Sequence, residues 1–221
     1  MTGQGSIKEK VYNMIMEDIL SFEFRPNDIL NEKTLIEKYG YSKTSVREAL
    51  ITLCEEGVLR TLPRYGYEVV RITTDDIRDM LQSRCILEMG LLSISYESFT
   101  EKQLARLEEI DDECTACDED IWEHWRLNTY FHLKMISYCN NPYADELLQK
   151  TMDRLKRAYA QMYWNNRYHS SLSMDTRYHK EIIRCIRERD IENLKKAIVC
   201  DLSEFGGQNF LADMYLEKPI K

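Results

Sequence analysis

The 221-residue chain lacks any long run of apolar residues, and its first residues do not resemble a signal peptide. A membrane-spanning helix needs about 20 consecutive apolar residues, so we expect no membrane segment. Without a secretion signal, the expected location is the cytoplasm. The seven cysteines are odd in number and scattered, which predicts free thiols and argues against a disulfide framework.

The chain also has fewer basic than acidic residues. The chain carries 30 Lys+Arg against 38 Asp+Glu, a formal net charge of -8. Overall acidity disfavours contact with nucleic acid, because that contact depends on cations that neutralise phosphates. The deficit is uneven: residues 1–72 hold 10 Lys+Arg and 11 Asp+Glu, whereas the remainder holds 20 and 27. Affinity for DNA would therefore need a local basic patch and two copies of the N-terminal region.

Strand patterns are missing after residue 73, and no second cysteine pair follows Cys114-Thr-Ala-Cys117 at the spacing of a zinc finger. We interpret Cys114 and Cys117 as two thiols one helical turn apart, with a redox role as the minor alternative. Helical periodicity instead runs through about six segments, the last two covering residues 174–189 and 191–211. Residues 73–221 therefore read as an all-helical bundle.

The most informative stretch is Tyr41-Ser-Lys-Thr-Ser-Val-Arg-Glu-Ala-Leu50. Ser42 is a good helix N-cap, and three apolar positions recur behind it at helical spacing: Val46, Leu50 and Leu53. Three polar residues fall off that apolar face, near the positive end of the helix: Lys43, Thr44 and Arg47. They suit a phosphate and a base edge in a DNA major groove. Taken alone, a Ser-x-x-x-x-Arg pattern favours an ordinary charged surface helix, and the flanking segments are needed to favour the DNA interpretation.

The flanking segments complete a compact unit. Residues 7–22 and 30–39 show helical periodicity, and the helix that starts at Ser42 ends near Gly57. Residues 58–62 and 67–71 alternate like strands around the turn residues Pro63-Arg-Tyr-Gly66. Three helices followed by a hairpin predict a winged helix-turn-helix over residues 1–72, with the hairpin as the wing.

This unit resembles the DNA-binding domain of the GntR family of bacterial transcription regulators. The matching residues are Arg25-Pro, Leu30, Leu35, Tyr39-Gly, the stretch from Ser42 to Leu50, Leu53, Glu56-Gly-Val58 and Pro63-Arg-Tyr-Gly66. The resemblance implies the following DNA contacts: Lys33, Ser42, Lys43, Thr44 and Arg47, with Arg64 and Gly66 on the wing. Lys33 and Lys43 stand where close relatives often have arginine, and lysine lacks the bidentate fork of that residue.

The helical part resembles the FCD effector domain of the FadR subfamily of these regulators. The matches are Arg84 with Glu88, Phe131-His132, Asn141, His179, and Asp190 with Ala197 before Asp201. That domain often holds a divalent metal on one aspartate and three histidines in a central cavity. Here Asn128 replaces the aspartate and Asp201 replaces the last histidine. His124 and His169 match no family position and are expected at the surface.

The resemblance implies a metal site on His132, His179 and Asp201, with Asn128 as a weak fourth ligand. Two imidazoles and a carboxylate suit zinc, nickel or manganese. The alternative is a buried, metal-free network of hydrogen bonds. Arg84, Asn128, His132 and His179 are the residues implied to bind an effector. Arg84 could pair with an acidic effector, or simply with Glu88 one turn away.

The fold class we predict is therefore mainly α. The function we predict is a sequence-specific DNA-binding regulator, usually a repressor in this family. Its partners would be a double-stranded operator, a small organic or sugar acid and a second copy of the chain. One alternative is a regulator that responds to the metal itself. The other is a metal-dependent hydrolytic enzyme, which lacks a recognisable nucleophile–base pair and would leave the Ser42 stretch unexplained.

Overall fold

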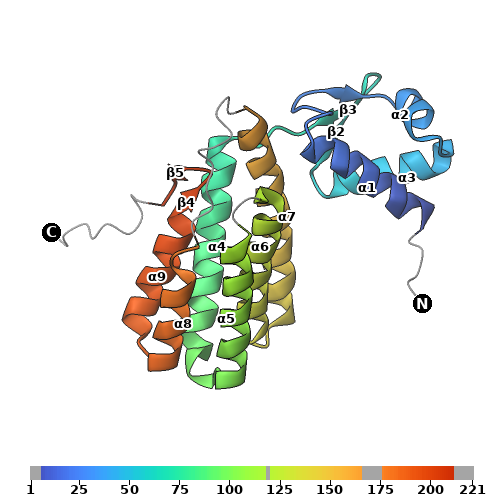
Figure 1. The fold of residues 1–221 in the computed structure, drawn as a ribbon. Helices are drawn as coiled ribbons and strands as arrows, with labels where there is room; N and C mark the ends of the chain where they lie inside the picture. The colour runs from blue at the N-terminus through green and yellow to red at the C-terminus, as the bar shows by residue number, and fades with distance from the viewer. Residues whose placement is uncertain (1–5, 118–119, 166–175, 212–221) are drawn as a thin grey trace. The chain divides into compact units, whose positions relative to one another are not determined.

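A computed structural model describes residues 6–117, 120–165 and 176–211. The chain divides into two compact units, Met1–Thr73 with Ala160–Asn165 and Thr74–Tyr159 with Asn166–Lys221. The described residues are mainly helical with a small antiparallel sheet (Figure 1), which confirms the predicted fold class. The exact domain limits at residues 72 and 73 remain a prediction. No helix within the described ranges is long and apolar enough to cross a membrane.

The first unit contains three helices and three short strands. Its helices are α1 (Ile7–Leu20), α2 (Glu32–Tyr39) and α3 (Lys43–Glu55). Its strands are β1 (Ile29–Leu30), β2 (Leu59–Leu62) and β3 (Gly66–Val69), paired antiparallel in the order β1-β3-β2. Together they form the predicted winged helix-turn-helix.

The start of the second helix differs from the prediction. Leu30 was expected inside that helix, but it lies in β1, opposite Tyr67 of β3. The helix begins only at Glu32, because the Asn31 side chain accepts a hydrogen bond from the backbone N–H of Lys33 and so caps it. Gly40, with φ of 73°, ends the helix in the left-handed conformation as its sequence position predicts.

One apolar core holds this unit together. Its buried members come from all three helices, from the sheet and from the link between α3 and β2: Val11, Ile15, Ile19, Leu30, Leu35, Val46, Ala49, Leu50, Leu53, Val58, Leu59 and Val69. Each buried leucine or isoleucine contributes about 1.5–3 kcal/mol relative to an exposed one. The core therefore fixes the angle at which α3 presents its opposite, polar face to solvent.

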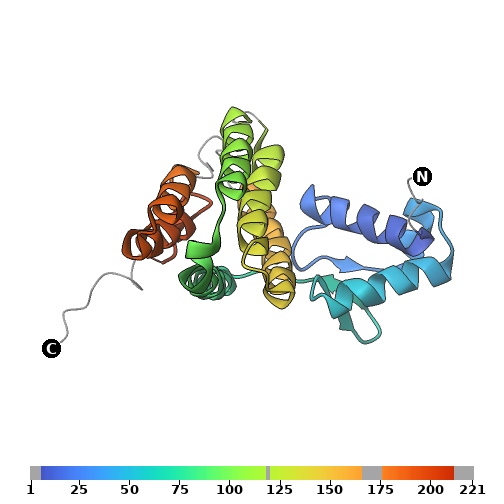
Figure 2. The ribbon, with the colours of Figure 1, turned by 90° about the horizontal axis from the view of Figure 1, so that it is seen from below.

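The second unit is a helical bundle (Figures 1 and 2). Its elements are α4 (Thr74–Ser95), the 3₁₀ turn η1 (Tyr96–Ser98), α5 (Glu101–Ala116), α6 (Ile121–Ser137), α7 (Pro142–Asn165) as far as Tyr159, α8 (His179–Glu188) and α9 (Ile191–Ser203). Pro142 opens α7 where its missing N–H costs nothing, and the Asn141 side chain accepts from the N–H of Ala144.

Two expectations about the end of the chain were wrong. The helix predicted from residue 174 begins, in the described region, at His179. The last helix stops at Ser203 and not near Leu211, and a two-residue hairpin follows it: β4 (Glu204–Phe205) and β5 (Gln208–Asn209). Gly206 and Gly207 have φ of 57° and 75°, a left-handed conformation that closes the tight turn between β4 and β5.

Candidate functional site

The polar face of α3 is the first candidate site. The Ser42 hydroxyl accepts the backbone N–H of Ser45 at 3.3 Å, so Ser42 is the predicted N-cap. The predicted stripe of Val46, Leu50 and Leu53 is fully buried. Because that stripe faces the core, the remaining polar residues at the helix start are exposed: Lys43, Thr44 and Arg47.

The other residues implied to contact DNA lie on α2 and on the wing. Lys33 is exposed in the first turn of α2, and Arg64 is exposed at the hairpin tip with φ of 73°. Gly66 has φ of 131°, and a Cβ there would lie 2.3 Å from the carbonyl oxygen of Leu30. Only glycine therefore lets β3 approach β1 at this point.

Sequence reasoning missed an acidic residue beside this face. Glu32 Oε1 lies 3.9 Å from Nε of Arg47 and accepts a 3.1 Å hydrogen bond from the hydroxyl of Tyr67. Burial, followed by the contact with Glu32, raises the pKa of Tyr67, so this hydroxyl keeps its proton. The carboxylate thus joins the start of α2, the exposed face of α3 and strand β3.

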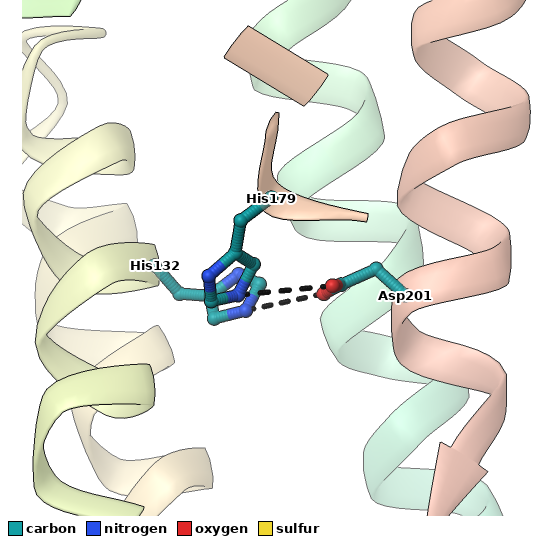
Figure 3. Close-up of side chains that lie close together, drawn as sticks. All are labelled: His132, His179 and Asp201. Atoms are coloured by element: carbon teal, nitrogen blue, oxygen red, sulfur yellow. Dashed lines mark ion pairs between the residues drawn. The ribbon is translucent and has the colours of Figure 1, made fainter. Parts of the chain in front are cut away.

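The second candidate site lies in the helical bundle. Three buried side chains converge there: His132 of α6, His179 of α8 and Asp201 of α9 (Figure 3). Nε2 of His132 lies 3.2 Å from one oxygen of Asp201, and Nε2 of His179 lies 3.7 Å from the other. One ligand atom from each residue lies within 4.8 Å of the other two, so the three could share one metal ion.

Each histidine is held from behind by a second carboxylate. Nδ1 of His132 lies 2.8 Å from Glu88, and Nδ1 of His179 lies 3.0 Å from Asp111. Phe131 stacks on the ring of His179, with centroids 3.8 Å apart. The family resemblance had pointed to Glu88, but nothing in the sequence marked Asp111, which is 1% exposed.

This arrangement decides where the imidazole protons sit. Because each Nδ1 faces a carboxylate, it carries the proton, and in the neutral ring Nε2 is then a lone-pair acceptor. While both rings are neutral, the two Nε2 lone pairs face the Asp201 carboxylate, a repulsive arrangement that either a cation between them or a proton on Nε2 relieves. Within the described structure, His179 Nε2 and Asp201 Oδ1 are buried and have no hydrogen-bond partner. Converging acceptors with a carboxylate behind each histidine are the donor set of a divalent cation site, so these residues fit a metal.

The charges around the site agree with this description. Burial alone would raise the pKa of Glu88, but Arg84 and His132 outweigh it and lower that pKa to about 2. Burial acts the same way on Asp201, where His179 and His132 prevail and lower the pKa. Both carboxylates are therefore ionised; Glu88 is paired with Arg84, and Asp201 offers its negative charge to a cation between the two histidines.

A cavity opens beside the cluster. Four of its lining residues are Arg84, Asn128, His132 and Asp201; the others are Leu81, Trp125, Met152, Leu202, Glu204, Phe205 and Gly206. The expected pairing of Arg84 with Glu88 is present, with Nε 2.5 Å from the carboxylate. The buried Nη2 of Arg84 has no partner among the described residues, and its contact with an effector stays a prediction. Of the four residues implied to bind an effector, His179 is the one outside the lining described here.

The sequence predicted that the two remaining histidines, His124 and His169, lie at the surface. His124 was expected at the surface, but it is 7% exposed, and its Nδ1 lies 3.1 Å from the carbonyl oxygen of Cys114. The tight packing of α5 against α6 encloses it. His169 lies outside the described residues.

All seven cysteines are free thiols, as predicted, including the buried Cys114 and the half-buried Cys117.

Comparison with known proteins identifies both units. Residues 7–69 match the bacterial regulatory proteins of the gntR family, and residues 79–203 match the FCD domain. The chain belongs to the gntR family. Among curated relatives, the HTH-type transcriptional repressor RspR of Escherichia coli (strain K12) is 25% identical over 203 residues, covering 90% of this chain and 86% of RspR.

Further comparisons agree with this assignment. The uncharacterized HTH-type transcriptional regulator YdhC of Bacillus subtilis (strain 168) is 24% identical over 192 residues, which cover 85% of this chain and 84% of YdhC. The solved structure of E. coli McbR/YncC shares the fold at a TM-score of 0.70 and 20% identity, covering 90% of this chain and 94% of that one. The gntR protein described here is thus a DNA-binding transcription regulator with an effector-binding FCD domain, and the enzyme alternative is set aside because its family and relatives are regulators.

Proposed function

We propose that this gntR regulator is a homodimeric repressor whose operator binding changes when a small organic or sugar acid binds beside a divalent metal in the FCD domain. The name of RspR, a transcriptional repressor, supports the sign of regulation. An effector can act only if it binds one dimer geometry more tightly than another.

The observation that carries the proposal is the position of Arg84. Its unpartnered Nη2 is buried in the lining of a cavity that also contains His132 and Asp201. A buried charged donor without a partner costs about 1–3 kcal/mol, which a bound carboxylate would recover. A carboxylate in this cavity could bond Arg84 with one oxygen and face the metal with the other.

The metal would be held by His132, His179 and Asp201, whose two imidazoles and one carboxylate suit zinc, nickel or manganese. Bound there, it would supply positive charge that attracts an acidic effector. Asn128 lines the same cavity but offers only a neutral carbonyl oxygen. We therefore propose a weak, exchangeable metal that is retained better when an acid is bound.

Operator contact would come from six exposed residues of the first unit and from the half-buried Gly66 of the wing; the six are Lys33, Ser42, Lys43, Thr44, Arg47 and Arg64. A single winged helix offers too little specific area, and this unit has no net positive charge. Two copies on a pseudo-palindromic operator would supply the missing affinity.

An unpartnered face of α4 supports the homodimer. Ile86 and Ile94 are 62% and 82% exposed, and Gly90 lies between them with open space where a Cβ would stand. A two-fold axis midway between Ile86 and Gly90 would pack each Ile86 against Gly90 of the second copy.

One experiment tests the whole proposal. Double-stranded sites are selected from a randomised library with purified protein, and affinity for the selected duplex is then measured with zinc alone, with citrate or gluconate alone, and with both together. We expect a palindromic site whose affinity changes most with zinc and acid together. An unchanged affinity in every arm would overturn the effector proposal, and failure to select any sequence would overturn the proposed operator contacts.

The alternative of a metal-responsive regulator has its own outcome. If zinc alone shifts operator affinity fully and neither acid adds to the shift, the metal is itself the effector.

Sedimentation of the wild type and of Ile86→Glu tests the dimer. The matched control is Leu147→Glu, at an exposed leucine of α7. We expect only Ile86→Glu to give monomers, and a monomeric wild type at micromolar concentration would contradict the proposed dimer.

A further inference from the structure

The carboxylate of Glu32 occupies an unexpected place for a protein that approaches a polyanion. It lies at the first residue of α2, beside the polar face of α3 that is proposed to enter the groove. A negative charge there repels phosphates and lowers affinity for any DNA sequence. A role in helix capping does not require it, because Asn31 already caps α2.

The contacts of Glu32 single out one arginine. Its Oε1 atom lies 3.9 Å from Nε of Arg47, and the Arg47 side chain is 62% exposed. An arginine reads guanine through two parallel donors, and a carboxylate beside Nε leaves both terminal nitrogens available. Glu32 can therefore fix the direction of the guanidinium without occupying the donors that read a base.

The Glu32 carboxylate is itself held in place. The hydroxyl of Tyr67 donates to the same Oε1 atom at 3.1 Å, and the Tyr67 ring packs against the core of the unit. Tyr67 also pairs with Leu30 across β1 and β3, which places β1 next to the start of α2. The Glu32 carboxylate is thus anchored to the framework, and its attraction for the guanidinium 3.9 Å away favours one direction of the exposed Arg47 side chain before DNA binds.

We propose that Glu32 is a positioning and specificity residue for operator recognition, acting through Arg47 and anchored by Tyr67. It lowers affinity for all DNA by its charge and increases discrimination by restricting Arg47 to one base position. This inference rests on the proposed operator contact of Arg47.

The effect of Glu32 on affinity for all DNA and its effect on discrimination between sequences can be measured separately. Glu32→Gln keeps an oxygen that can accept from Tyr67 but removes the charge. We expect it to tighten binding to a shuffled duplex of the same composition while leaving or weakening binding to the duplex selected by the wild type. The ratio of the two affinities should fall on the order of 3- to 10-fold. A repeat selection with Glu32→Gln should lose the preference at one base position in each half-site.

Three further variants make the test specific. Glu37→Gln removes an equal charge from α2, where the carboxylate faces Lys33, so it should change both affinities by the same factor and leave their ratio intact. Tyr67→Phe should lower the ratio as Glu32→Gln does, with the thermal unfolding midpoint as a check on the fold. In an Arg47→Ala background, Glu32→Gln should no longer change the ratio.

The outcomes separate this inference from the function on which it rests. An unchanged ratio in Glu32→Gln, or the same fall in ratio without Arg47, would overturn the role of Glu32 while leaving operator binding in place. A wild type that selects no sequence would instead overturn the proposed operator contacts themselves.

Discussion

Asp111 Oδ1 lies 3.0 Å from Nδ1 of His179, and both side chains are buried. Asp111 comes from α5, whereas the residue that faces the other nitrogen of the ring, Asp201, comes from α9. His179 is thus fixed between two carboxylates on separate helices. Its Nε2 lone pair is aimed at the metal position before any metal binds.

The first prediction concerns that pair. Asp111→Asn should weaken zinc binding by about 10- to 100-fold, because it removes the charge that orients and polarises His179. Asp112→Asn is the matched control: Asp112 is adjacent, exposed and paired with Lys180. Calorimetric titration of both variants checks the prediction, and equal affinities would show that Asp111 is only structural.

The second prediction concerns Asn128. Asn128→Asp adds an anionic ligand one helical turn from His132 and should tighten zinc binding by roughly 10-fold or more. Metal content after purification and calorimetry measure this. Stoichiometric, chelator-resistant metal in the wild type would contradict a weak site. Absence of binding in both proteins would leave His132, His179 and Asp201 as a buried polar network.

The third prediction concerns pH in the metal-free protein. Burial and Arg84 lower the pKa of His132, but Glu88 and Asp201 prevail and raise it above 6.5. A raised folded pKa stabilises the fold fully below pH 6.5 and ceases to do so as the pH rises through the folded value. We therefore expect the unfolding midpoint to fall as the pH rises above 6.5.

Zinc should reverse that trend. Histidine binds a metal in its neutral form, so metal binding raises the unfolding midpoint more at higher pH. Thermal unfolding over a pH series, in chelator and in zinc, measures both slopes. His132→Gln should flatten both slopes. If the chelator slope persists in His132→Gln, other groups are responsible for it.

The fourth prediction concerns the groove helix. Arg47→Ala should weaken binding to the selected operator by about 1–3 kcal/mol and relax discrimination at one position. Lys43→Ala should weaken binding to all duplexes by similar factors. It should also reduce the slope of log affinity against log salt concentration by about one, as expected for the loss of one phosphate contact. Mobility shifts over a salt series measure both effects. Unchanged affinity in both folded variants would remove α3 from the interface.

The groove helix could be predicted from the sequence because its determinants are local. Ser42, the apolar stripe behind it and the polar residues beside it are all set within a few residues, and α3 follows that pattern. The wing was predictable for the same reason, since its two strands flank a short turn. Family resemblance then supplied His132, His179 and Asp201, which the fold brings together.

Contacts between distant segments could not be predicted. Asp111 reads as one more acid in a charged helix until α5 packs against α8 and buries it against His179. Leu30 was predicted to be helical because its strand pairing with Tyr67 of β3 joins segments far apart in the sequence. The β4–β5 hairpin was missed because its strands are two residues long, too short to show alternation.

The three ligand atoms come from three helices far apart in the sequence, α6, α8 and α9. Such a site exists only after most of the bundle has formed, so a cation cannot speed the early steps of folding. Bound to the finished structure, it should slow unfolding, because contacts absent from the transition state affect mainly that rate. Metal supply would then set the lifetime of the folded regulator, and through it the amount of protein available to occupy the operator.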